Sequence, residues 1–173
     1  MTRPIALAFV AALIAGPAVA DVTASGPDSF RLDYAVDVET TPEVAYAAVG
    51  EVGRWWEASH TYSGDAANLS LALAPGGCFC EALPGGGVEH GRVMIAWPER
   101  MVRLDAALGP LQEMGVNGVL TFAWTPTPDR PDNLRLSVAY LVNGPGVGDL
   151  APVVDQVIGA QVSNWVRFIE QSE

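Results

Sequence analysis

The stretch DLAPVVDQVIGAQVSNWVRFIEQ, residues 149–171, decides how this chain folds. Its large apolar side chains recur every three or four positions and its polar side chains lie opposite, which predicts one long amphipathic helix. Asp149 is a suitable N-cap, and Pro152 fits the first turn, where backbone N–H groups have no partner. At ~1.5 Å per residue the helix is roughly 33 Å long, the length of a small domain.

Upstream of this helix, the chain is a series of short strand-like segments separated by turns. Residues 30–39 alternate apolar and polar side chains, which indicates an amphipathic strand. A helical stretch from Thr40 is interrupted by Gly50 and Gly53 and ends at Trp56, which favours two short helices with a bend. Turns rich in glycine, proline and aspartate then separate six further predicted strands, at 69–73, 78–83, 88–97, 101–108, 118–124 and 134–142. This order predicts an α+β domain in which a seven-stranded antiparallel sheet curves around the last helix and leaves a cavity.

Composition narrows the class of partner. The 173-residue chain is 50% hydrophobic and 17% charged, which suits a single globular domain. Its net charge is −11 and it has no basic cluster, so a nucleic-acid partner is not expected and anionic membrane surfaces are disfavoured.

The first 20 residues have the pattern of a secretory signal peptide. Arg3 precedes an apolar run at 5–15, and Ala18-Val19-Ala20 is a small-x-small cleavage site. We expect cleavage after Ala20, a periplasmic or secreted protein, and no stable membrane span in the mature chain. An uncleaved N-terminal anchor is the alternative. We therefore divide the chain into a signal peptide (1–20), a flexible arm (21–29) and one domain (30–173).

The chain resembles the SRPBCC superfamily of helix-grip proteins over about residues 30–171. The motifs that carry the likeness are Thr41-Pro42-Glu43, Arg54-Trp55-Trp56, the segments PGGCFCE at 75–81 and EHGRV at 89–93, and the final helix. The superfamily includes START lipid carriers, the birch-pollen allergen group, polyketide cyclases and the C-terminal domain of Hsp90-ATPase activators, to which the chain is most similar in appearance. The resemblance implies a helix-grip fold around a hydrophobic cavity. It does not imply one activity, because this fold hosts carriers, enzymes and interaction modules.

Alternate connections of an antiparallel meander lie at one end of the sheet, and this places the candidate site. The segments 57–67, 84–87, 109–117 and 143–148 should share a rim, with His60 and His90 on or near it. The segment around 109–117 is apolar, so it is either a lid over the cavity or part of the core. With a two-residue turn at Gly85-Gly86, Glu81 would pair with His90. Glu81 would then orient the imidazole for acid–base chemistry, or the pair would form a polar cluster with Arg92 on the convex surface.

Cys78 and Cys80 should share one face of their strand, which we expect to be the inner face. Three interpretations remain open: two buried hydrophobic residues, a disulfide, or ligands of a metal completed by other residues. The sequence has no complete metal motif, and we expect neither a metal nor a cofactor.

The leading functional hypothesis is a binding module for a small hydrophobic or amphipathic ligand. The second is a cyclase- or dehydratase-like enzyme in which His90 or His60 is the general base and Glu81 its partner. The third is an interaction module similar to the chaperone activators. For Trp55 and Trp56, packing in the core is the alternative to contact with ligand. The candidate ligand-binding residues are Trp55, Trp56, Trp97, Leu120, Phe122, Trp124, Tyr140 and Trp165.

Overall fold

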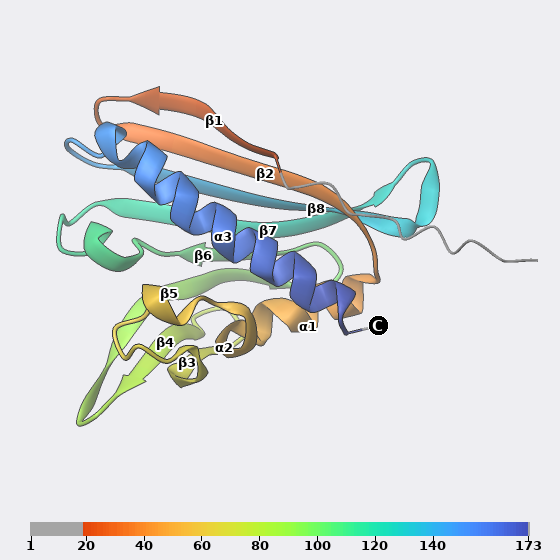
Figure 1. Ribbon diagram of the computed structural model, residues 1–173, viewed down its shortest axis with the longest axis horizontal. Helices are drawn as coiled ribbons and strands as arrows, with labels where there is room; N and C mark the ends of the chain where they lie inside the picture. Colours follow the sequence, from red (N-terminus) through yellow and green to blue (C-terminus); the bar gives the residue numbers. More distant parts are fainter. Residues whose placement is uncertain (1–18, 173) are drawn as a thin grey trace, which may run out of the picture.

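The computed structural model describes residues 19–172 and has the expected α+β architecture (Figure 1). A single open antiparallel sheet curves around one long C-terminal helix, as in helix-grip proteins. The strands are ordered β1-β2-β8-β7-β6-β5-β4-β3 across the sheet. Their bounds are β1 Val19–Gly26, β2 Ser29–Glu39, β3 Leu69–Leu71, β4 Cys78–Leu83, β5 Gly86–Trp97, β6 Met101–Asp105, β7 Asn117–Thr127 and β8 Arg130–Asn143.

Helix α3 (Ala151–Glu170) crosses the concave face of the sheet (Figure 1). Its apolar stripe is buried against the sheet, with Trp165 and Ile169 fully enclosed. The helix begins two residues later than the sequence predicted, because Asp149 lies in the short 3-10 helix η4 (Gly148–Leu150) that leads into it. Tyr34 on β2 attaches the helix to the sheet by donating a hydrogen bond to the carboxylate of Asp155, with 2.6 Å between the oxygens.

Two short helices follow β2, as expected. They are α1 (Pro42–Gly50) and α2 (Val52–Trp55), and they close one end of the curved sheet (Figure 1). Thr41 caps α1 by accepting a hydrogen bond from the backbone N–H of Val44. Three single-turn 3-10 helices lie in the later connections, namely η1 (Ala58–His60), η2 (Ala66–Asn68) and η3 (Gly109–Leu111). Among residues 19–172, no helix has both the length and the apolar character needed to cross a membrane.

The predicted flexible arm is replaced by an eighth strand. Residues 19–26 form β1, which pairs antiparallel with β2 and extends the sheet at its edge. The prediction of an arm at 21–29 was therefore wrong for these residues, since small polar side chains do not prevent a backbone from completing a sheet edge. The predicted signal peptide lies almost entirely outside the described residues.

Two bulges in β5 change the predicted register of the sheet. The β4–β5 turn is Pro84-Gly85 rather than Gly85-Gly86, so Glu81 pairs with Val88 and not with His90. His90 is then an extra residue, because Phe79 pairs with Gly91 while Cys80 pairs with Glu89. A β-bulge of this kind lets neighbouring residues of one strand point to the same side.

The bulge at His90 explains why both His90 and Val93 are buried on the concave side. Strict alternation would have placed them on opposite faces. A second register shift, between Val93 and Ile95, reverses the alternation of side chains again near the end of β5. It therefore directs Trp97 to the outer face. The interpretation of Glu81 and His90 as a polar cluster on the convex surface was therefore wrong, because both are buried; only Arg92 lies on that surface, where it pairs with the Glu89 carboxylate.

The two cysteines form a disulfide. They lie on the outer face of β4, while the residues between and after them, Phe79 and Glu81, are buried on the inner face. The expectation of an inner position was wrong. The Cα atoms of the cysteines are 5.4 Å apart, within the range that a disulfide spans and shorter than the ~6.6 Å of two fully extended residues. Among the described residues, no three His, Cys, Asp or Glu side chains are grouped as a metal site requires.

Candidate functional site

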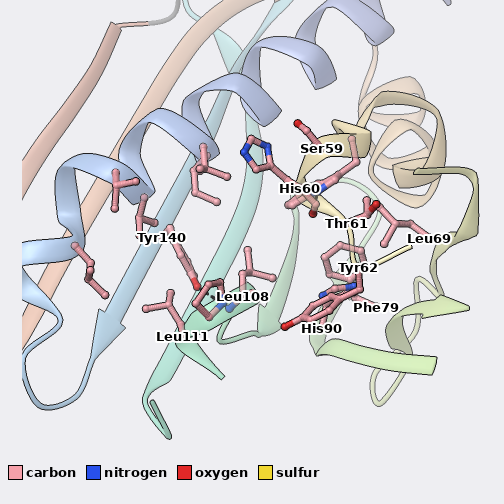
Figure 2. A pocket seen from close by; sticks show the side chains of 18 of the residues that line it. Ser59, His60, Thr61, Tyr62, Leu69, Phe79, His90, Leu108, Leu111 and Tyr140 are labelled. Atoms are coloured by element: carbon pink, nitrogen blue, oxygen red, sulfur yellow. Dashed lines mark hydrogen bonds between the residues drawn. The ribbon is translucent and has the colours of Figure 1, made fainter. Parts of the chain in front are cut away.

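A cavity of about 530 Å³ lies between the sheet and the first half of α3. This volume is typical of a small-molecule site. Most of its walls are apolar, and Figure 2 shows them converging from the sheet, from α3 and from two loops. The lining residues are Trp56, Ser59, His60, Thr61, Tyr62, Leu69, Phe79, His90, Leu108, Gly109, Pro110, Leu111, Glu113, Tyr140, Leu150, Val153, Val154, Val157 and Ile158.

His90 and Glu81 form a buried acid–base pair at the sheet side of the cavity. The Nε2 atom of His90 lies 2.9 Å from Oε2 of Glu81, and the two residues are 6% and 1% exposed. The imidazole of His90 lines the cavity, whereas Glu81 lies behind it. Figure 2 shows the imidazole beside the rings of Tyr62 and Phe79, with centroid separations of 5.9 and 5.0 Å.

The segment after η1 supplies the other partners of Glu81. The backbone N–H groups of Tyr62 and Ser63 donate to its two carboxylate oxygens, the former at 3.1 Å. Burial acts to raise the pKa of Glu81, but hydrogen bonds from Ser63, Tyr62 and His90 outweigh it and hold the pKa below the usual range. Glu81 is therefore a carboxylate at neutral pH.

The ionised state of Glu81 determines which nitrogen of His90 carries the proton. A carboxylate only accepts hydrogen bonds, so Nε2 of His90 must be the N–H that donates to Glu81. In the neutral ring, Nδ1 then has a free lone pair, and among the described residues it has no hydrogen-bond partner. The pair thus places an oriented imidazole base in the wall of an apolar cavity.

His60 lines the opposite side of the cavity, close to α3 (Figure 2). Its Nδ1 atom lies 3.0 Å from a carboxylate oxygen of Glu57 and 3.2 Å from the amide nitrogen of Gln161. Gln161 is buried on α3 and also accepts a hydrogen bond from the backbone N–H of Glu57, which fixes this loop against the helix. The side chain of His60 is 36% exposed, unlike the enclosed pair of His90 and Glu81.

The apolar loop after β6 covers part of the cavity and also packs on the core. Leu108, Gly109, Pro110 and Leu111 line the cavity, and Leu111 is 3% exposed. Tyr140 on β8 fastens the loop, because its hydroxyl donates to the carbonyl of Ala106 at 3.0 Å and accepts from the N–H of Leu108 at 3.1 Å. Burial raises the pKa of Tyr140 to about 12, although the bond from Leu108 acts in the other direction. Tyr140 is therefore a structural contact and not an acid near neutral pH.

The structure divides the predicted ligand-binding residues into three groups. Trp56 and Tyr140 line the cavity, as do both predicted histidines. Trp97 does not: its side chain is 47% exposed on the outer surface, stacked against Arg100, because of the second bulge in β5. The remaining residues are buried in the core and do not line this cavity; they are Trp55, Leu120, Phe122, Trp124 and Trp165.

Tyr62 and Phe79 line the site but were not predicted as site residues. No pattern in the sequence marks Tyr62, because it joins the site through a loop that folds back over β4. For Phe79 the available signal was Gly91, its pairing partner on β5. An isolated glycine within a strand often marks a bulge or a close approach. A side chain at Gly91 would place its Cβ 2.6 Å from the Cβ of Ala106.

The charges around the cavity restrict the class of ligand. The chain has no lysine, and none of the arginines within residues 19–172 lines the cavity, whereas Glu113 does. Among these lining side chains, only the histidines can therefore become cationic. An anionic ligand such as a fatty acid or a phosphate ester would have no permanent counter-charge here.

No model of a known protein family matches the sequence, and no curated protein matches it significantly. Solved structures are similar at low sequence identity. They include a Thalictrum flavum norcoclaurine synthase mutant in complex with a transition state analogue (11% identity, TM-score 0.55, 83% of this chain and 96% of that chain). A protein from Rhodobacter sphaeroides matches at 15% identity and a TM-score of 0.56 over 90% of this chain and 100% of that one.

The di-domain ARO/CYC protein StfQ of the steffimycin biosynthetic pathway is similar at 14% identity and a TM-score of 0.56. This chain covers 52% of StfQ, about half its length, and the match includes 84% of this chain. At such low identities the likeness concerns the fold alone. This protein thus has a helix-grip fold, the architecture that the resemblance implied.

Proposed function

We propose that this protein binds a small, uncharged, mainly apolar molecule in the cavity beneath α3. The observation that supports this most strongly is the combination of a 530 Å³ apolar cavity with one oriented hydrogen-bond acceptor, Nδ1 of His90. Apolar burial provides the affinity and a single polar contact provides orientation. A ligand hydroxyl that donates to Nδ1 of His90 fits both features.

The uncharged fluorescent anilinonaphthalene dye N-phenyl-1-naphthylamine tests whether the cavity accepts a guest. Val157 lines the cavity from α3, and Val157→Trp would fill part of it and weaken dye binding at least tenfold. Gln156 is exposed on the same helix, so Gln156→Trp adds the same ring outside the cavity and should leave binding unchanged. Equal affinities for the two variants, or no binding by the wild type, would contradict the proposal.

A pair of naphthalene compounds tests the role of His90. The wild type should bind 1-naphthol about fivefold more tightly than naphthalene, since one net hydrogen bond contributes about 1 kcal/mol. His90→Phe should remove this preference while retaining affinity for naphthalene. A preference that survives the substitution would show that another group binds the hydroxyl.

A second candidate function is acid–base catalysis on the bound molecule. It is favoured by the ionised Glu81 that fixes the His90 tautomer, because a buried base oriented in this way can accept a proton from an acidic C–H or O–H. Proteins of this fold include a norcoclaurine synthase and an ARO/CYC protein. Once a ligand is identified by native mass spectrometry of protein from its own host, solvent deuterium should enter the ligand in the presence of wild type and not of His90→Gln.

We also propose that the mature protein is periplasmic or secreted and begins at Asp21. The N-terminal pattern supports this, and so does the disulfide, because such bonds persist in oxidising compartments. The intact mass of protein isolated from its host tests the proposal. A chain that still begins at Met1 would contradict it. Among residues 19–172, no feature specifically favours the interaction module that the resemblance to Hsp90-ATPase activators implied.

A further inference from the structure

Strand β4 carries a disulfide on one face and two residues of the cavity site on the other. Cys78 and Cys80 are joined on the outer side. Between them, Phe79 lines the cavity with its ring 5.0 Å from that of His90. The next residue, Glu81, holds His90 by its Nε2–H. A change in the backbone of β4 therefore acts directly on the groups that shape the site.

The disulfide lies at the surface of a second hollow. This hollow has a volume of about 630 Å³ and lies on the outer side of β4, between β3 and the α1–α2 turn. Both cysteines line it, and both are half-buried, so a small thiol can approach them. Arg54 and Glu51 line the same hollow, and their side chains form an ion pair there at 3.8 Å.

Stabilisation of the fold does not explain this bond well. A disulfide stabilises a protein mainly by restricting the unfolded chain, and the effect grows with the length of the closed loop. Here the two cysteines are separated by one residue, so the loop is nearly the shortest possible. The bond restricts the unfolded chain little, but in the folded protein it fixes the backbone on both sides of Phe79.

We propose that Cys78–Cys80 is a reversible thiol–disulfide site whose redox state controls the cavity; the part that concerns ligand affinity rests on the proposed function. The thiolate of a small thiol attacks one cysteine sulfur, the S–S bond breaks, and the other cysteine leaves as a thiolate. A second thiol attacks the resulting mixed disulfide. Two small thiols are thereby oxidised to their disulfide, and their two electrons reduce Cys78 and Cys80 to thiols.

The consequence for the cavity follows from the backbone geometry. The bond holds the Cα atoms of Cys78 and Cys80 at 5.4 Å, whereas an extended strand places such atoms ~6.6 Å apart. Reduction removes this restraint beside the bulge where His90 is inserted into β5. Phe79, which also packs on Trp56 at 5.5 Å, and the bond between Glu81 and His90 then lose their fixed positions.

Accessibility is tested first, on the folded wild type. The protein is treated with excess dithiothreitol without denaturant, alkylated with iodoacetamide and weighed by mass spectrometry. Both cysteines should be labelled within minutes, and reoxidation should abolish labelling. A bond that resists reduction until denaturant is added would overturn the proposal.

Coupling is tested by NMR of the two imidazoles, which are the only ones in the chain. Long-range ¹H–¹⁵N spectra report the tautomer of each ring, and His60→Gln assigns the signals. On reduction, the His90 nitrogens should shift and the Nε2–H preference should weaken, with full return on reoxidation. The anilinonaphthalene dye should bind at least threefold more weakly to the reduced form. The double variant Cys78→Ser/Cys80→Ser should behave as the reduced protein does and ignore added thiol.

The two proposals fail in different ways. If no dye binds in either redox state but the His90 signals respond to reduction, the cavity function is wrong and the control of the site remains. If the dye binds equally to both forms and the His90 signals do not move, redox control is wrong and the cavity function remains.

Discussion

Replacing Glu81 by glutamine should destabilise the protein by about 2–4 kcal/mol, although the two side chains have the same shape. In the wild type, one carboxylate oxygen accepts from the N–H of Ser63, and the other accepts from the N–H of Tyr62 and from Nε2–H of His90. A glutamine has one oxygen and one NH₂ group. In either orientation its NH₂ group therefore faces a backbone N–H, which leaves that donor without an acceptor and removes the charge-assisted bonds.

Urea unfolding at pH 7 measures this cost. With a slope of ~2 kcal/mol per molar urea, the midpoint of Glu81→Gln should fall by about 1–2 M while the slope stays constant. Glu89→Gln is the matched control. Glu89 lies on β5, the strand next to that of Glu81, but it is exposed and pairs with Arg92. Exposed ion pairs contribute little, so this variant should remain within about 0.5 kcal/mol of the wild type.

The difference between wild type and Glu81→Gln should also depend on pH. The folded-state pKa of Glu81 is below its ordinary value, so its ionisation stabilises the fold above the unfolded-state pKa of ~4.3. That contribution is lost as the pH falls from there through the lower folded-state pKa, and the two stability curves should converge. The reasoning is refuted if Glu81→Gln matches the wild type at pH 7, if Glu89→Gln is equally costly, or if the gap is the same at pH 7 and below pH 4.

Three further predictions concern the elements around the cavity. Gly91→Ala should destabilise the fold by about 1–3 kcal/mol in urea unfolding, because its Cβ would lie 2.6 Å from that of Ala106; Gly86→Ala, in open space on the same strand, should change stability by less than about 0.5 kcal/mol. Tyr140→Phe should cost about 1–3 kcal/mol and accelerate amide hydrogen exchange at Leu108, and unchanged exchange would contradict the role of this hydroxyl in fastening the loop. The difference in tyrosinate absorbance between the wild type and Tyr140→Phe should show a pKa of about 12 for Tyr140. Because the folded-state pKa is raised, Tyr140 contributes stability below pH ~10, and this contribution is lost as the pH rises through 12.

The order and type of the main elements could be predicted from the sequence because they depend on local periodicity. The three-to-four spacing of apolar residues in 149–171 produced α3, and the alternation in 30–39 produced β2. The eighth strand could not be predicted in this way. The segment 19–26 has little apolar alternation, and it forms β1 because the edge of β2 offers unpaired backbone groups.

The candidate site could be predicted only in part. His60, His90 and Glu81 were identified as residue types suited to acid–base chemistry, but which face Glu81 and His90 occupied could not be decided. Side chains of a strand alternate with a period of two, so one inserted residue reverses every position beyond it. The insertion at His90 brought this residue into the cavity, and a second one near Met94 turned Trp97 out of it.

The sequence by itself determined a curved antiparallel sheet closed by one amphipathic helix, an acidic surface and a pair of cysteines on one face of a strand. These properties follow from local spacing and composition, which no distant contact alters. Only the tertiary structure decided that Nε2 of His90 meets Glu81, that the amides of Tyr62 and Ser63 hold this carboxylate ionised, and that the disulfide lies behind them. These contacts join segments 9 to 19 residues apart, and they depend on a turn position and two bulges whose energies differ too little between registers for the sequence pattern to reveal them.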